Sequence, residues 1–556
     1  MDARTNAEVD ALVVGAGPVG LTMAIELVRH GLRCRIVDKN EARTDKSKAL
    51  VLWSRSLEVL DDMGGAAPFL AAGMPAHGAS LFSGGKRLVH VTFEGIDSPY
   101  PYGLMIPQSE TERLLEQRLA SLGVAVERRT EVTRVRGDAD GVTTALRRTD
   151  GAEESLRSAW LLGCDGAHST VRHELGIEFA GEVEPNDWIL ADAHVHGTLA
   201  PDEVTLFWHA TGILAFFPIS PGRFRMIADL GLARGTDHPP DPTLAQAQAV
   251  LDQRGPGGLG LSDPVWLAGF RIHERKVVDY RRGRVFLAGD AAHIHSPAGG
   301  QGMNTGMQDA YNLGWKLGLC HAGRVRDLLL DSYSSERSAV GDVVLRNAAA
   351  MTRVATLRNP IAQELRRRIV PLLASLDFVR SKMTSTMAEL EIDYGASPLS
   401  GEHRGLTATA WLLGHGVAPG SRAPDGELVD AASGRSTTLF DVLRGTRHVL
   451  LALAGMGPDA ARVSRVAAAA RGVEARFAGS IEPCLLIAGG SVPGGADAAG
   501  LRVLLDASQA LHRRYAAAGE TLYLIRPDGY VGHRSQPANA SALESHLARY
   551  LIPRDA

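Results

Sequence analysis

The chain has 556 residues, of which 45% are hydrophobic and 22% are charged, and these values are typical of a globular protein. They exclude a disordered or fibrous chain, and the length predicts about three or four domains. The 59 basic and 63 acidic residues leave a formal charge of −4, which excludes a protein that wraps nucleic acid with a basic surface.

Cysteine usage and hydropathy indicate the cellular location of the protein. Cys34, Cys164, Cys320 and Cys484 lie far apart and form no Cys-x-x-Cys motif, which favours a reducing compartment. No segment approaches the roughly 18 consecutive apolar residues of a membrane span. We therefore expect a cytoplasmic protein without a membrane partner.

Residues 10–38 predict a strand, a glycine turn, a helix and a second strand. The turn reads Gly15-Ala16-Gly17-Pro18-Val19-Gly20. In a dinucleotide-binding βαβ unit the first glycine makes the turn, the second admits a pyrophosphate, and the third lets helix and strand pack. The following helix directs its positive dipole end at the phosphates. Asp38 ends the second strand, where the ribose hydroxyls of an adenosine need an acceptor.

This glycine pattern alone carries little information. With 61 glycines in 556 residues, it is expected by chance about 0.7 times. Residues 255–260 match it as well, but they follow a helix-like segment and precede Ser262-Asp263-Pro264, so we interpret them as a loop. The first match has the required context, because a strand precedes it and a helix with one apolar face follows it.

The rest of the chain divides into segments with different patterns of apolar and aromatic residues. Short strands and helices alternate to about residue 176, and alternating aromatic segments from about residue 187 to 270 predict an inserted, mostly antiparallel sheet. A strand, a Gly-rich loop and a helix over about residues 303–319 follow, then a helical stretch over about 343–390 and a linker at 395–405. We therefore predict an α/β protein with a Rossmann-like domain in two parts (1–186 and 276–395), an insertion (187–275) and a separate C-terminal α/β domain (401–556).

Two later segments resemble the Asp-Gly and Gly-Asp motifs of the class A flavoprotein monooxygenases, the para-hydroxybenzoate hydroxylase-like aromatic hydroxylases. They are LLGCDGAHSTVR at 161–172 and RVFLAGDAAHIHSPAGGQGMN at 284–304. The resemblance implies that Asp165 serves both FAD and the nicotinamide donor, and that Asp290 binds ribityl or ribose hydroxyls of FAD. It also implies a loop along the isoalloxazine, with contacts from Pro297, Gly299, Gly300, Gly302, Met303 and Asn304.

The resemblance extends to other segments. It places Gln108, in IPQSETERLL, beside the flavin, and it puts Lys48 where the family usually has an Arg that contacts FAD. Lys is a point charge without the bidentate fork of Arg. The tail resembles the thioredoxin-like domain of the phenol hydroxylase and polyketide aromatic hydroxylase branch. Because Cys484 stands alone there, a role in assembly or stability is expected.

The resemblance implies an FAD-dependent monooxygenase. NADPH or NADH would reduce the flavin, O₂ would add at C4a, and the hydroperoxide would hydroxylate a phenolic or polycyclic aromatic substrate. Two alternatives stay open. One is a flavin oxygenase of the same fold that performs Baeyer-Villiger or decarboxylative oxidation. The other is an FAD-binding module without turnover.

The inserted sheet is the expected substrate wall, with inward side chains from Phe207, Trp208, Phe216, Phe217 and Met226. A large apolar cavity would suit a polycyclic or alkylated phenol. His209, Arg223 and Arg225 are weak candidates for polar contacts, so no catalytic acid or base is identified. His293 and His295 alternate without a Cys or carboxylate cluster, and we expect no metal site. The expected partners are the aromatic substrate and O₂, and a homo-oligomer stays open.

Overall fold

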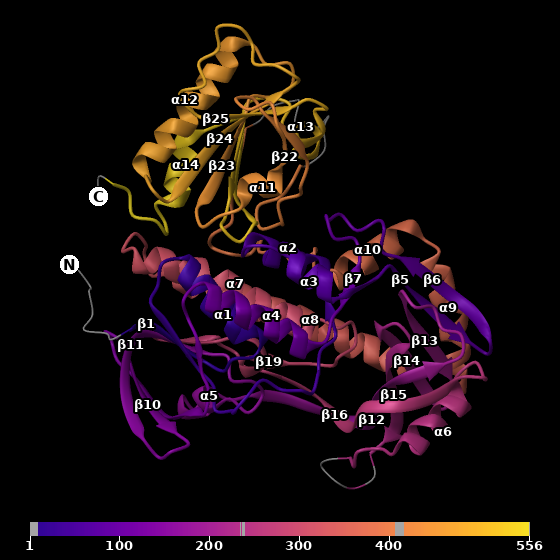
Figure 1. The fold of residues 1–556 in the computed structure, drawn as a ribbon. Coiled ribbons are helices and arrows are strands. Elements are labelled where there is room, and N and C mark those ends of the chain that lie inside the picture. The colour runs from indigo at the N-terminus through magenta and orange to yellow at the C-terminus, as the bar shows by residue number, and fades with distance from the viewer. Residues whose placement is uncertain (1–8, 234, 236–238, 406–415, 555–556) are drawn as a thin grey trace.

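The computed structural model describes residues 9–233, 235, 239–405 and 416–554. Figure 1 shows a broad lower body that carries the C-terminal domain, in orange and yellow, on top. The body has two parts. The first sheet lies on the left of the view, and the inserted sheet lies on the right.

The first sheet is the Rossmann-like part of the body. Its eight strands include the parallel set β18-β11-β1-β2-β8. The strand β1 is buried along almost its whole length, as expected for a parallel strand covered on both faces. The strands of this sheet are β1 (Val9–Val14), β2 (Cys34–Val37), β8 (Val126–Glu127), β9 (Thr130–Gly137), β10 (Val142–Arg148), β11 (Glu153–Gly163), β17 (Arg281–Arg282) and β18 (Val285–Leu287). The helices around it are α1 (Pro18–Arg29), α4 (Gln108–Ser121), α5 (Thr170–Glu174) and α7 (Gly302–His321).

The inserted sheet also has eight strands, in the order β19-β16-β12-β15-β14-β13-β5-β6, and all pairs except β13–β5 are antiparallel. It extends beyond the predicted insertion, since two strands precede residue 187 by about a hundred residues and one follows residue 275. The strands are β5 (Gly78–Ser83), β6 (Lys86–Thr92), β12 (Ala180–His196), β13 (Glu203–His209), β14 (Gly212–Ser220), β15 (Arg223–Leu232), β16 (Gly260–Lys276) and β19 (His293–Ile294). Helix α6 (Leu244–Arg254) packs on one face.

Smaller elements join the two parts. A three-stranded sheet consists of β3 (Val51–Leu52), β7 (Gly103–Met105) and β4 (Met74–Ala76). Between β3 and β4 the chain forms two helices, α2 (Ser54–Asp62) and α3 (Ala67–Ala72). After α7 the chain forms α8 (Leu328–Ala355), α9 (Pro360–Ala374) and α10 (Asp377–Met387). The predicted helical stretch over about 343–390 is therefore three helices.

The C-terminal domain is a mixed α/β unit. Its sheet has the order β20-β27-β26-β23-β24-β25-β21-β22, with parallel β23, β24 and β25 at the centre. The strands are β20 (Gly401–Arg404), β21 (Glu427–Asp430), β22 (Ser436–Thr438), β23 (His448–Leu453), β24 (Ile481–Ala488), β25 (Arg502–Asp506), β26 (Thr521–Ile525) and β27 (Val531–Gln536). The helices are α11 (Leu439–Leu443), α12 (Ala460–Arg476), α13 (Ala510–Arg514) and α14 (Ala540–Leu547). The predicted linker at 395–405 contains β20, which pairs with β27.

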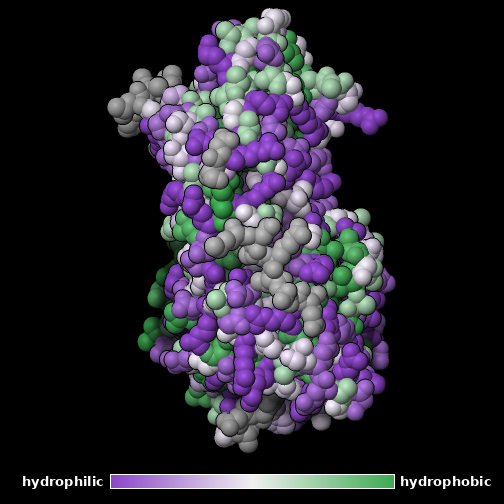
Figure 2. Space-filling view, turned by 90° about the vertical axis from the view of Figure 1, so that its left-hand side faces the viewer, coloured by the Kyte–Doolittle hydropathy of each residue, from purple (hydrophilic) through white to green (hydrophobic). Residues whose placement is uncertain are grey.

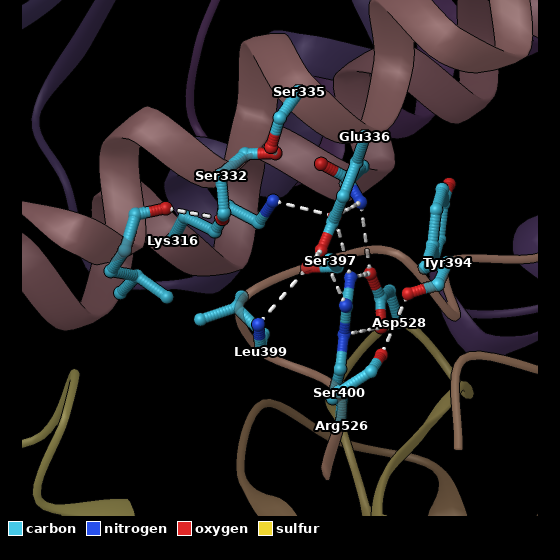
Figure 3. Close-up of polar contacts among 12 residues, drawn as sticks. Lys316, Ser332, Ser335, Glu336, Tyr394, Ser397, Leu399, Ser400, Arg526 and Asp528 are labelled. Carbon is cyan, nitrogen blue, oxygen red and sulfur yellow. Dashed lines mark hydrogen bonds and ion pairs between the residues drawn. The ribbon is translucent and has the colours of Figure 1, made fainter.

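A buried ionic cluster joins this domain to the body (Figure 3). Glu336 of α8 accepts hydrogen bonds from both terminal nitrogens of Arg526, at 2.7 and 2.9 Å, and from Lys316 Nζ of α7, at 2.8 Å. Asp528 accepts from Trp315 Nε1 at 3.1 Å. The surrounding cations hold the pKa of Glu336 well below its usual range, although burial alone would raise it.

Two surface observations complete the fold. No helix within the described ranges is both long enough and apolar enough to cross a bilayer. The face in Figure 2 is mostly hydrophilic, with hydrophobic residues in small groups.

Gly255–Gly260, the second glycine match, connects α6 to β16, which confirms that it is a loop.

Candidate active site

Four neighbouring parallel strands end at the same edge of the first sheet. Val14 of β1 pairs with Val37 of β2 and with Gly163 of β11, and Gly163 pairs in turn with Leu287 of β18. The predicted glycine loop, Asp38, Asp165 and Asp290 follow these strand ends directly. The structure therefore brings together motifs that lie up to 275 residues apart in the sequence, at the edge where open α/β sheets bind their ligands.

The glycine loop is shaped by its surroundings. Gly15 has φ +97°, and a Cβ there would lie 2.5 Å from the carbonyl oxygen of Cys164. A Cβ on Gly20 would lie 1.9 Å from the carbonyl oxygen of Gly15. At Gly17, by contrast, the described residues leave the Cβ position open to 4 Å. Two glycines thus permit the turn, and the third leaves a space that a ligand can approach.

Asp38 holds the loop from the neighbouring strand. Its Oδ2 accepts a hydrogen bond from the Ala16 N–H at 2.7 Å, and its Oδ1 accepts from the Asn40 N–H at 2.7 Å. A carboxylate can accept further bonds on its remaining lone pairs. Helix α1 starts with Pro18 at its first position and has no side-chain cap from the described residues, so its first N–H groups face the loop.

Asp165 organises the second motif. Its carboxylate accepts from the Ser169 hydroxyl at 2.5 Å and from the Val171 N–H at 3.1 Å, which orders the start of α5. Burial raises the pKa of Asp165, and these hydrogen bonds partly offset the shift. Arg172 then donates to the carbonyl oxygen of Ala291 at 3.0 Å and so ties this motif to the Asp290 turn.

Asp290 is the one exposed residue in an otherwise buried run from 285 to 293. It keeps access to solvent although protein atoms surround it, and this desolvation raises the pKa of its carboxyl. Electrostatic interactions with His293 and Lys48 lower that pKa in turn. Lys48, predicted from the segment before β3, therefore lies within electrostatic reach of Asp290.

The fully buried carboxylate of Asp309 holds the Asp290 turn in place. Asp309 of α7 accepts from the Gly289 N–H at 2.9 Å and hydrogen-bonds His293 Nε2 at 2.8 Å. Its other oxygen accepts from Arg337 Nε at 2.6 Å. The ring of His295 stacks beside that of His293, and burial lowers the pKa of His295 to about 4. These interactions hold both ends of the turn and leave the Asp290 side chain pointing outward.

The loop before α7 is anchored to β3 and α2. Asn304 Oδ1 accepts from the Trp53 N–H at 2.9 Å, and Asn304 Nδ2 donates to the carbonyl oxygen of Val51 at 2.9 Å. Trp53 Nε1 donates to the carbonyl oxygen of Gly299 at 2.8 Å. Gly299 and Gly300 have φ +89° and +65°. The Asn304 side chain is thus used within the protein, and any contact with a cofactor would come from its backbone.

The rest of this predicted contact set lies around the same loop. Pro297 is exposed, Gly302 is half-buried and Met303 is buried. As with α1, the described part of the chain supplies no side-chain cap to the first turn of α7. Gln108 accepts from the Ala49 N–H at 3.1 Å and donates to Glu112 at 2.9 Å, so it supports the segment next to Lys48.

The five predicted wall residues do not form one surface. Phe207, Phe216 and Met226 pack with α6 in one core cluster, whereas Trp208 and Phe217 belong to clusters on the opposite face. Strand alternation explains the division, because neighbours such as 207 and 208 point to opposite sides. The second face meets the loop before α7, since Phe217 joins the cluster that contains Trp53, and Trp53 hydrogen-bonds Gly299 of that loop.

The three polar candidates are all bonded within the protein. His209 Nδ1 hydrogen-bonds the Thr211 hydroxyl at 2.9 Å within the β13–β14 turn, and Arg223 pairs with Asp263 at the surface. Arg225 is buried and binds Asp192 through two nitrogens, each at 2.8 Å. Its third nitrogen donates to the carbonyl oxygen of Lys48 at 2.9 Å. Arg225 thus links the inserted sheet to the Lys48 segment near Asp290.

Several positioning residues were not identified from the sequence. Asp309 and Arg337 lie on α7 and α8 among other polar residues, so no local sequence pattern distinguishes them. Arg172 lies inside the predicted Asp-Gly motif. Glu389, which has φ +59° and is 2% exposed, accepts from the Thr305 hydroxyl at 2.8 Å and from Gln308 Nε2.

These features fit FAD. The open position at Gly17 and the uncapped start of α1 suit its pyrophosphate, and the exposed Asp290 suits its hydroxyls. The uncapped start of α7 offers N–H groups to an electron-rich ring edge.

Comparison with known proteins identifies the family. The model described as "FAD binding domain" matches residues 8–348, and that described as "Aromatic-ring hydroxylase, C-terminal" matches residues 417–552. The chain is 34% identical to 6-methylpretetramide 4-monooxygenase from Streptomyces rimosus, over 98% of this chain and 94% of that protein.

Solved structures agree. The OxyS anhydrotetracycline hydroxylase from Streptomyces rimosus aligns with a TM-score of 0.74 and 30% identity, over 98% of this chain and 99% of that one. A ternary complex of aklavinone-11 hydroxylase with FAD and aklavinone aligns with a TM-score of 0.73 and 25% identity, over 98% and 99%. NAD(P)H is the usual co-substrate of such enzymes. The chain therefore belongs to the FAD-dependent aromatic monooxygenases with an aromatic-ring hydroxylase C-terminal domain.

Proposed function

We propose that this monooxygenase hydroxylates a polycyclic phenol of the polyketide type. The observation that carries this proposal is the position of the inserted sheet. Its face with Phe217 and Arg225 adjoins the loop anchored by Trp53, while the opposite face is filled by α6. The near full-length similarity to 6-methylpretetramide 4-monooxygenase favours a fused-ring substrate over a single ring.

The proposed FAD contacts follow from the strand ends. Gly15, Gly17, Pro18 and Gly20 would admit the pyrophosphate, and Asp38 would accept from the ribose. Asp165 and Asp290 would serve hydroxyl groups of the cofactor, with Lys48 and Gln108 beside the flavin. The loop contacts would come from Pro297, Gly299, Gly300, Gly302, Met303 and Asn304. The charge of Lys48 beside Asp290 and the raised pKa of Asp290 support this arrangement.

FAD supplies the oxidation chemistry: it accepts hydride from NADPH or NADH and activates O₂. The chain must exclude water and orient the ring of the substrate. Arg225 does not act as a free cation in this scheme, because Asp192 neutralises it. Its proposed role is to hold the Lys48 segment against the sheet. The start of α7 would stabilise negative charge that develops on the flavin.

The test uses the purified, FAD-loaded protein with NADPH and ¹⁸O₂. Fused-ring phenols and single-ring phenols are compared by mass spectrometry of the products. We expect one labelled oxygen as a new hydroxyl group on a fused-ring substrate. Turnover of single-ring phenols alone would contradict the substrate class, and a ring-expanded lactone would identify Baeyer-Villiger oxidation instead. We also propose a cytoplasmic location, which the four free cysteines support because thiols stay reduced there.

A further inference from the structure

Glu389 places a buried carboxyl group at an unusual backbone position, directly after the end of α10. Its φ is +59°, and the Leu390 N–H donates to the carbonyl oxygen of Ser385 at 3.0 Å to close the helix. Helices commonly have glycine at this position, because other residues rarely adopt a positive φ. Non-glycine residues in such conformations concentrate at functional sites. Since closing the helix does not require a glutamate, we expect another role for its side chain.

The carboxyl group of Glu389 contacts the first two turns of α7. Its Oε1 accepts a hydrogen bond from the Thr305 hydroxyl at 2.8 Å, and its Oε2 accepts from Gln308 Nε2. Gln301, the residue directly before α7, donates from Nε2 to the carbonyl oxygen of Thr386 at 2.8 Å. The end of α10 is therefore bonded to the start of α7, the helix whose first N–H groups suit the flavin.

The charged groups around Glu389 leave its carboxyl without a counter-ion. No basic residue in the described ranges forms an ion pair with it. The titratable groups on the surrounding elements bond one another instead: Asp309 with His293 and Arg337, Arg337 with Tyr394, Arg55 with Glu58, and Lys382 with Glu391. A buried carboxyl without a counter-ion favours its neutral form. Burial accordingly raises the pKa of Glu389 to about 8, although the hydrogen bond from Thr305 and the charge of Arg337 oppose the shift.

A negative charge on Glu389 would act against the dipole of α7. The N-terminus of a helix carries a partial positive charge, which favours a nearby anion. Thr305 and Gln308 are the fourth and seventh residues of α7, so they lie about 5 and 9 Å along its axis from Gly302. Two unit charges about 12 Å apart change a proton affinity roughly tenfold at an effective dielectric constant of about 20. An ionised Glu389 is therefore close enough to oppose negative charge on a flavin at the start of α7.

We propose that Glu389 positions the first two turns of α7 and, by ionising, couples the reduction potential of the bound flavin to pH. The proposal rests on the placement of the flavin at this helix in the function proposed above. Reduction transfers a hydride from NADPH or NADH to the flavin and leaves NADP⁺ or NAD⁺, so the flavin ring gains one negative charge. An ionised Glu389 then takes up one proton from solvent, which removes its own charge. A Glu389 that is already neutral takes up none.

The test measures the midpoint potential of the flavin between pH 7 and pH 10, by spectroelectrochemistry of the purified, FAD-loaded protein. Glu389→Gln keeps the hydrogen-bonding capacity but cannot ionise. Glu389→Gly removes the side chain and suits the positive φ. The matched control is Glu391→Gln, because Glu391 lies two residues further along the same segment and forms its ion pair with Lys382.

We expect the potentials of the wild type and of Glu391→Gln to fall by about 30 mV more over this pH range than those of the two Glu389 variants. For a two-electron couple this corresponds to a tenfold change in the proton affinity of Glu389 on reduction. A side chain that only supported the fold would shift the potential equally at every pH.

Equal pH dependence in the wild type and the Glu389 variants would overturn the proposal, and so would loss of the wild-type dependence in Glu391→Gln. If Glu389→Gln does not fold, Glu389→Gly provides the same comparison. No aromatic substrate is present in the measurement. A wrong substrate class would therefore leave these results unchanged, and the two proposals fail separately.

Discussion

Glu389 allows a sharp test of the electrostatics at the start of α7, where it accepts hydrogen bonds from Thr305 and Gln308. The side chain is 2% exposed, and burial raises its pKa to about 8, although hydrogen bonds from Thr305 and Gln308 and the charge of Arg337 oppose the shift. Below pH 8 the folded protein therefore keeps this carboxyl protonated. The unfolded chain releases the proton near pH 4.5. Folding stability must therefore fall as the pH rises from about 4.5 to about 8, because in this window only the folded state binds the proton.

The magnitude follows from the window. Each pH unit costs about 1.4 kcal/mol while only the folded state is protonated, so the wild type loses about 3–4 kcal/mol from this group between pH 5 and pH 8. Glu389→Gln keeps the shape and hydrogen-bonding capacity but cannot ionise. The free energy of unfolding of the variant should therefore rise relative to the wild type by that amount across the same range and level off above pH 8.

Urea unfolding at pH 5, 6, 7 and 8, followed by circular dichroism at saturating FAD, measures this difference. Glu391→Gln is the control, because Glu391 is a partly exposed residue whose ion pair with Lys382 is worth about 1 kcal/mol or less. Parallel stability curves for the wild type and Glu389→Gln would refute the reasoning. A difference that shrinks as the pH rises would show an ionised Glu389 stabilised by its surroundings.

Three further predictions concern the cofactor site and the domain contact. Glu336→Gln leaves the buried Lys316 and Arg526 without their shared counter-charge, so calorimetry should show a loss of about 3–5 kcal/mol; an unchanged melting temperature would contradict the role of the cluster. Gly17→Val adds atoms where the protein leaves space, so it should weaken FAD binding at least about 100-fold, or about 3 kcal/mol, with the apo-protein's stability unchanged. Equal FAD affinity measured by flavin fluorescence would exclude the pyrophosphate from this loop. Asp290→Ala removes charged hydrogen bonds worth about 1.5–3 kcal/mol, so the Kd for FAD should rise roughly 10- to 100-fold in the same titration. A Kd within two-fold of wild type, by contrast, would remove Asp290 from the cofactor contacts.

The motifs of the FAD site could be predicted because their signals are local. A strand, a short turn and a polar residue are adjacent in sequence at Gly15, Asp38, Asp165 and Asp290, and parallel strands bring their carboxyl ends to one edge. The family resemblance and the fold class are confirmed. The assignment of individual FAD contacts stays a prediction.

The supporting interactions could not be predicted from the sequence because they join residues on elements that are far apart along the chain. Asp309 meets Arg337 across 28 positions, and Glu336 meets Arg526 across 190. The pairing of β5 with β13 likewise has no local sequence signal. By contrast, the division of the predicted substrate wall between the two faces of the sheet did have a local sequence signal. Phe207 and Trp208 are adjacent in a strand and so must face opposite sides.

The inserted sheet has consequences for synthesis of the chain. Strands β5 and β6 leave the ribosome at residues 78–92, but their partner β13 follows only at 203–209. At 5–20 residues per second this delay lasts on the order of ten seconds. During that time β5 has an unpaired edge on the β13 side, and such edges recruit other chains. Slower growth at low temperature, which reduces the concentration of such nascent chains, should therefore raise the yield of folded enzyme in a recombinant host.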